Sequence, residues 1–86
     1  MPEISRFFGI VIRMYFREHG VPHFHAEYGD QRASISIETL SILEGNLPSR
    51  VYGLVVEWAS LHRGELKENW TRVTRHQATV KIEPLA

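Results

Sequence analysis

The sequence has no cysteine, no long apolar segment and no excess of charge of either sign. Without cysteine, neither a disulfide framework nor a thiolate metal site can stabilise the fold. The apolar runs are too short to cross a bilayer, and the N-terminus lacks the apolar core of a signal peptide. We therefore expect a cytoplasmic protein. Ten basic and ten acidic residues cancel, which argues against a protein that coats nucleic acid through charge alone.

The 86 residues suit one small domain covering residues 1–86, since no linker, repeat or low-complexity segment divides them. A chain of this length buries only about 60–65% of its unfolded surface, so its stability needs support. The available supports are an aromatic core, a metal held by histidine and carboxylate, or self-association. Nine aromatic residues and a hydrophobic fraction of 43% favour the first and permit a homo-oligomer.

The first half of the chain alternates apolar and polar residues with the period of a β-strand. The predicted strands cover residues 7–17, 23–28 and 32–38, with a short fourth strand at 40–43. Short connections between them predict an antiparallel meander. Residues 78–85 alternate again, which predicts either a last strand stopped by Pro84 or an ordered tail along the sheet.

The second half shows helical spacing. A helix is predicted to open at residues 47–50 with Ser49 as its N-cap, and Gly64 should end or kink it. Helical spacing resumes over residues 65–73. The expected fold class is α+β, with a small antiparallel β-meander of three to four strands packed on one face by two helices. A C-terminal strand is one alternative for the end of the chain.

Three of the five histidines lie within seven residues, from His19 to His25. In an extended segment, successive side chains point to opposite faces. His23, His25 and Glu27 should therefore share one face, while the apolar residues between them take the other. A strand with this pattern can pack into the core and still present polar groups on its far side.

A metal site is the first interpretation of this face. Two imidazoles and a carboxylate are ligands that zinc accepts without cysteine, and open nitrogen and oxygen sites also suit other divalent transition metals. His19 could approach across the turn and His62 from the helix. We expect no cofactor, with a divalent metal such as zinc held by His23 and His25 as the alternative.

Acid–base chemistry on RNA is the second interpretation. Histidine exchanges a proton near neutral pH, so two imidazoles can serve as base and acid with the RNA 2′-hydroxyl as nucleophile. Arginine would hold the phosphate, and an aromatic ring would stack on a base. The catalytic candidates are His23, His25 and Glu27, and the nucleic-acid-binding candidates are Arg13, Tyr15 and Arg17.

A structural interpretation stands beside both. His23 and His25 would then be strand residues that hydrogen-bond to their neighbours, and Glu27 would pair with Arg13 or Arg32.

His62 shares a helix face with Trp58, four residues earlier, which favours a half-buried helix histidine over a ligand. Trp58 and Trp70 are expected in the core. We therefore expect His62 on the opposite side of the sheet from His23 and His25, although the sequence leaves open whether it joins them.

A family pattern runs through nearly the whole chain. It is carried by His62 and by residues 4–12, 15–19, 22–29, 43–48, 56–59, 65–66, 69–70 and 81–85. Over these segments the chain resembles the bacterial domain of unknown function 4160 family. The resemblance implies a small stand-alone protein whose gene often neighbours that of another small uncharacterised domain, number 2442. It thereby implies a toxin–antitoxin-like module and assigns no catalytic residue.

The first functional expectation is a small component of such a two-protein module. It would bind an antitoxin-like or toxin-like protein encoded alongside it and act on RNA through the histidine and arginine surface. The alternative is a non-enzymatic binding module whose histidines are structural or hold a metal. Whether the protein is an enzyme stays open at this point.

Overall fold

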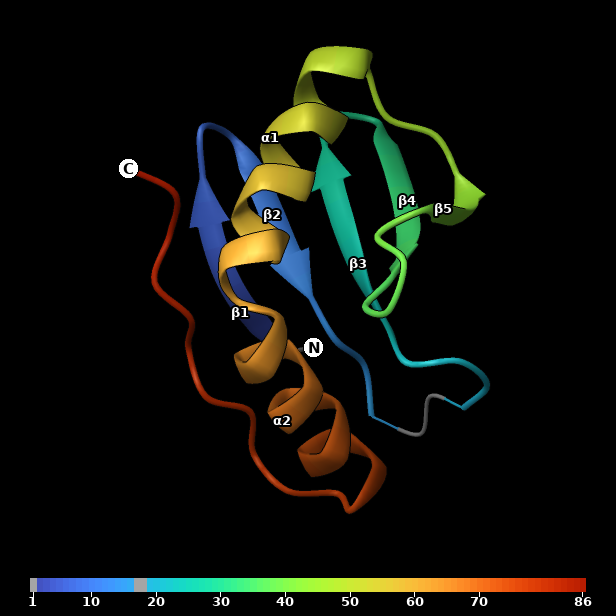
Figure 1. The fold of residues 1–86 in the computed structure, drawn as a ribbon, viewed down its shortest axis with the longest axis vertical. Helices are drawn as coiled ribbons and strands as arrows, with labels where there is room; N and C mark the ends of the chain where they lie inside the picture. Colours follow the sequence, from blue (N-terminus) through green and yellow to red (C-terminus); the bar gives the residue numbers. More distant parts are fainter. Residues whose placement is uncertain (1, 17–18) are drawn as a thin grey trace.

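The computed structural model describes residues 2–16 and 19–86. It has an α+β fold in which a five-stranded antiparallel sheet carries two helices on one face (Figure 1). The elements are β1 (Glu3–Phe7), β2 (Ile10–Arg13), β3 (His23–Tyr28), β4 (Gln31–Ser36), β5 (Ile42–Gly45), α1 (Ser49–Leu61) and α2 (Arg63–Thr74). Each strand pairs with the next along the chain, so the predicted meander is confirmed with more strands than expected.

The prediction of one strand over residues 7–17 was wrong. The chain turns back at Phe8 and Gly9, so that β1 and β2 form a hairpin. Both turn residues have positive φ, 50° at Phe8 and 78° at Gly9. Glycine adopts this conformation readily, whereas a bulky residue such as phenylalanine rarely does. At this turn the sequence has Phe8-Gly9 and not the Asn-Gly or Asp-Gly pair by which such a turn is normally predicted.

Two details of the helices also differ from the predictions. Ser49 is the first residue of α1 and not its cap, because Pro48 occupies the N-cap position without a side-chain hydrogen bond. The break between the helices falls at His62, two residues before Gly64. Gly64 lies in the exposed first turn of α2, where a Cβ would meet no atom within 4 Å.

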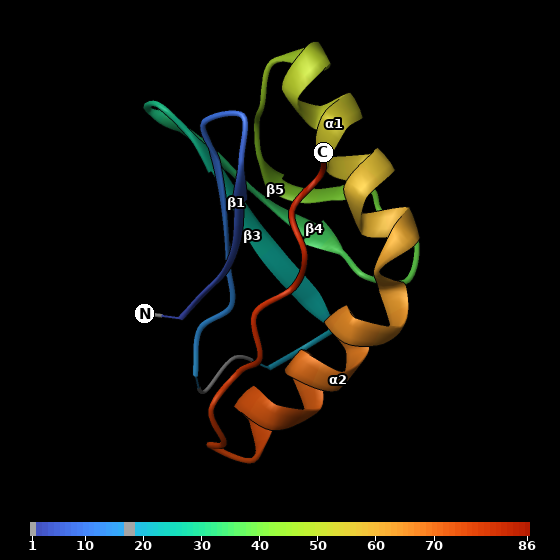
Figure 2. The same cartoon turned by 90° about the vertical axis from the view of Figure 1, so that its left-hand side faces the viewer.

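The core lies between the helices and the face of the sheet that they cover (Figure 2). Trp58 of α1 is fully buried, and its ring lies 5.3 Å from that of Phe7 and 6.0 Å from that of Phe24. The alternate residues of the central strands are buried with it, as the period-two pattern predicted: Ile10, Ile12, Phe24, Ala26, Ala33 and Ile35.

The C-terminal residues form an ordered tail along β1 and not a further strand. The Ile82 N–H donates to the Ile4 carbonyl at 2.8 Å, and the Ser5 hydroxyl donates to the Ile82 carbonyl at 3.0 Å. Of the two alternatives for residues 78–85, the tail is the one that forms. It covers the β1 edge of the sheet, and no helix of the described residues covers the face of the sheet opposite α1 and α2 (Figure 2).

Candidate functional site

β3 presents its polar residues on the face opposite its core residues, and the first of them, His23, lies beside α2. His23, His25 and Glu27 are half-buried there, while Phe24 and Ala26 between them are fully buried on the core side. The alternation of faces that the sequence predicted for this segment is therefore what the strand forms.

Four rings line up along one side of this surface. The Tyr15 ring lies 4.5 Å from that of His25, His25 lies 5.1 Å from His23, and His23 lies 5.1 Å from Trp70. We call these four side chains the ring row. The ring row begins just after β2, follows β3 from His25 to His23 and ends on α2. Trp70 was expected in the core, but it is half-buried and extends the histidine pair onto the second helix.

Glu27 holds two of its neighbours in place. Its carboxylate accepts hydrogen bonds from Arg13 Nε and from the Tyr15 hydroxyl, each at 3.3 Å. Burial raises the pKa of Tyr15 above its usual value, and the negative charge of Glu27 raises it further. The contact with Arg13 agrees with the structural interpretation, in which Glu27 pairs with Arg13 or Arg32.

The two histidines are held by different partners. His23 Nδ1 lies 2.8 Å from the Val21 carbonyl oxygen, which can only accept a hydrogen bond. A neutral His23 ring that makes this bond carries its proton on Nδ1. His25 Nδ1 lies 3.4 Å from the Ser34 hydroxyl. The ring orientations are thus set by a loop carbonyl and by the neighbouring strand.

The surface beside the ring row is hollowed. One hollow of about 590 Å³ is lined by Tyr15, His25, Glu27, Arg32, Ala33, Ser34, Glu44 and Gly45. A second, of about 370 Å³, is lined by His19, Val21, His23, Ser34, Leu43 and Glu44. Because Ser34 and Glu44 line both, the two hollows adjoin on the polar face of the sheet.

Among the lining residues, sequence reasoning missed three charged or polar ones as site residues: Arg32, Ser34 and Glu44. The β3–β4 register places Arg32 opposite Glu27 and Ser34 opposite His25. The turn at residues 29–30 contained the signal for both, because a short hairpin loop fixes the register. Glu44 depends on the irregular pairing of β5 with β4, for which the sequence carries no comparable signal.

Two other residues considered for the site, Arg17 and His62, are not part of the ring row. Arg17 falls outside the described residues. His62 lies 2.5 Å from a carboxylate oxygen of Glu65 through its Nδ1, and its ring lies 5.6 Å from that of Trp58. These contacts place His62 with the helices and not with His23 and His25, as its spacing from Trp58 predicted.

A metal centre is not assembled in the described part of the chain. Over residues 2–16 and 19–86, no three His, Asp or Glu side chains are grouped so that they could hold an ion. His23 and His25 form a pair of imidazoles, and within this part neither His19 nor His62 completes a set of three ligands.

None of the helices in the described ranges is long and apolar enough to span a membrane.

The fold and the site define a small α+β protein whose antiparallel meander is covered by helices on one face and presents histidines, aromatic rings and charged groups on the other. Residues 9–71 match the model of a family described as a domain of unknown function, DUF4160. This match covers well over half of the chain, which therefore belongs to that family. No curated protein and no solved structure matches the chain.

Proposed function

We propose that this protein binds single-stranded RNA on the polar face of its sheet and is the RNA-acting component of a toxin–antitoxin-like pair in the bacterial cytoplasm. The observation that carries the RNA proposal is the ring row beside the adjoining hollows. Membership of a family of unknown function assigns no activity. The pairing with a second protein therefore rests only on what the family resemblance implies about neighbouring genes.

RNA suits this face because its bases can be splayed out and stacked on aromatic side chains and arginine planes. The ring row supplies such side chains in half-buried positions, where their orientation is fixed before a ligand arrives. Arg13 and Arg32 supply positive charge on the same face. A chain with zero net charge gains little affinity from long-range attraction, so stacking is the term that must supply it.

The histidine pair supports a cleavage step. In this proposal His23 Nε2 takes the proton from the RNA 2′-hydroxyl, the 2′ oxygen bonds to phosphorus, and the bond to the 5′ oxygen breaks. His25 gives a proton to the departing 5′ oxygen, and arginine offsets the charge that develops on the phosphoryl oxygens. Glu27 holds Arg13 and Tyr15 in position for this step.

The alternative is a non-enzymatic binding module. It is favoured by the bond of His23 to the Val21 carbonyl and by the packing of both imidazoles between other rings. These contacts would equally serve histidines that only shape the surface. The two functions share RNA binding and differ in whether RNA is cut.

Expression of the chain alone in a bacterial host tests the proposal. Wild type is expected to slow growth and to fragment cellular RNA, whereas the His23→Ala/His25→Ala double variant should do neither. His76→Asn is the matched control, because His76 is exposed and lies outside the ring row and both hollows. Circular dichroism verifies that each variant folds.

Equal growth and intact RNA in the wild-type and double-variant cultures would contradict the toxic, RNA-cutting role. If purified wild type still binds RNA in that case, the non-enzymatic alternative takes its place.

A further inference from the structure

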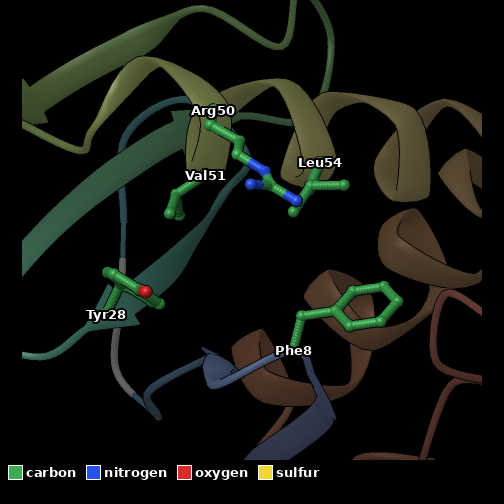
Figure 3. A pocket seen from close by; sticks show the side chains of 5 residues that line it. All are labelled: Phe8, Tyr28, Arg50, Val51 and Leu54. Carbon is green, nitrogen blue, oxygen red and sulfur yellow. The ribbon is translucent and has the colours of Figure 1, made fainter.

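A third cavity lies beside the first turns of α1 (Figure 3). It has a volume of about 330 Å³ and is lined by Phe8, Tyr28, Arg50, Val51 and Leu54. The β1–β2 turn, the end of β3 and the first turns of α1 supply these residues. None of them lines either hollow of the polar face.

Phe8 occupies a position that disfavours phenylalanine. Its φ of 50° is strained for a bulky residue, and the two-residue turn that it opens normally selects asparagine, aspartate or glycine. Phe8 is 59% exposed, and its ring meets that of Phe7 edge to face at 6.4 Å, so burial within this chain offsets only part of that strain. Folding alone therefore does not account for an aromatic residue at this turn.

Arg50 is the second residue of α1 and is also placed against the stability of the fold. Cations are unfavourable near a helix N-terminus, and the first turn of α1 contains no acidic residue to compensate. Arg50 is exposed, and its side chain makes no hydrogen bond or ion pair with any residue of the described ranges. Figure 3 shows its guanidinium over the cavity, with Phe8 and Tyr28 on either side of the space below it.

Two residues that each cost stability meet at one cavity, which is the pattern expected where function has overridden local preference. Phenylalanine, tyrosine and arginine are enriched at protein interfaces, and tyrosine and arginine also at the residues that carry most of the binding energy. The cavity is shallow, with Phe8 59% and Tyr28 40% exposed. A small ligand would stay largely in solvent there, whereas the surface of a partner protein would cover both rings.

We propose that this cavity docks a partner protein through an apolar side chain that enters it and a neighbouring carboxylate that pairs with Arg50. The carboxylate follows from charge complementarity, because the guanidinium has no acidic partner among the described residues. The inference rests on the partner-binding half of the proposed function and does not depend on RNA binding by the opposite face.

The probes are two panels of amidated hexapeptides, in which a leucine, phenylalanine or tryptophan stands between two glutamates or between two lysines. Titrations followed by ¹⁵N chemical shifts should show binding of the glutamate panel at least about tenfold tighter than the lysine panel. The largest shifts should fall on Phe8, Tyr28 and Leu54. Arg50→Glu should reverse the preference between the panels.

Phe8→Asn is the second variant, because asparagine suits the turn. It should lower peptide affinity at least about tenfold without lowering the melting temperature, and it should leave RNA binding unchanged. If the wild-type protein binds the peptides but does not bind RNA, the RNA proposal is overturned and the docking proposal is not. Docking of a protein is overturned if neither panel binds at millimolar peptide or if Arg50→Glu leaves the preference unchanged. It is also overturned if N-acetylphenylalanine binds as tightly as the peptides.

Discussion

At the scale of single residues, Glu27 organises the polar face through its bonds to Arg13 and Tyr15. The burial and the negative charge that raise the pKa of Tyr15 mean that the folded protein holds the phenolic proton more tightly than the unfolded chain. The stabilisation is fully present below the ordinary tyrosine value of about 10 and is lost as pH rises through the folded-state value.

The free energy of unfolding should therefore fall as pH rises above about 10, and Tyr15→Phe should make that fall less steep. Urea denaturation across this pH range, followed by tryptophan fluorescence, measures both slopes. Identical slopes in wild type and Tyr15→Phe would contradict the role assigned to the phenol.

The stability of the fold also depends on Gly45. Its φ is 87°, and a Cβ there would overlap the Arg32 carbonyl oxygen on the neighbouring strand. Gly45→Ala should lower the free energy of unfolding by at least about 2 kcal/mol, through backbone strain and the forced displacement of β4.

Gly53→Ala is the matched control for this substitution. Gly53 lies in the interior of α1, where a Cβ would meet no atom within 4 Å. This change should raise the free energy of unfolding by about 0.5–1 kcal/mol. Equal effects of the two substitutions would show that the contact between β5 and β4 is not as described.

Residue-scale prediction worked where geometry is local. The shared face of His23, His25 and Glu27 follows from strand alternation alone. The contact of His23 with Trp70 could not be predicted, because it depends on where α2 lies relative to β3 and no local pattern encodes that position.

At the scale of elements, the C-terminal tail is fixed by side chains from both helices. Asn69 is buried in α2 and forms two bonds with the Val80 backbone, donating at 2.9 Å and accepting at 2.8 Å. Trp58 Nε1 donates to the Glu83 carbonyl at 2.8 Å. These bonds hold the tail beside β1 without a regular strand ladder. The sequence of the tail alternates like that of a strand, but its hydrogen bonds go largely to side chains.

Asn69→Leu keeps the side chain similar in size but removes both bonds to Val80. It should lower the free energy of unfolding by about 1–3 kcal/mol and remove hydrogen-exchange protection from the Val80 and Ile82 amides. Asn46→Leu, at an exposed loop position, is the control. Unchanged exchange at Val80 in Asn69→Leu would contradict the role of this side chain.

Element-scale prediction succeeded for β3 and β4, whose apolar alternation is bounded by turn residues. It failed for the β1–β2 hairpin because Phe8 stands where a turn-forming residue is expected. The residue that misled the sequence prediction is also one that the proposed docking cavity requires. Local preferences and function conflict at that turn, and sequence reasoning followed the local preferences.

At the scale of the whole molecule, two surfaces of different chemistry lie on different sides of a small core. The polar face offers rings, arginines and acidic groups beside open hollows, and the helix side offers an apolar cavity with one arginine. This separation would let the chain hold RNA and a protein partner at the same time.

Because the chain has zero net charge, we expect RNA binding to depend only weakly on salt. Each phosphate contact on a single strand contributes about −0.7 to the slope of log affinity against log salt. Contacts from Arg13 and Arg32 alone would therefore give a slope of about −1.4. Fluorescence anisotropy with a labelled single-stranded RNA measures this slope, and a value several times steeper would show that charge and not stacking dominates.

The most direct test of the central claim is a ¹⁵N chemical-shift titration of the full chain with a single-stranded RNA oligonucleotide. If RNA binds on the ring row, saturable shifts should centre on Tyr15, His23, His25 and the Trp70 indole, and they should be lost in the His23→Ala/His25→Ala variant. Absence of shifts, or shifts centred on any other surface and retained in that variant, would contradict that claim.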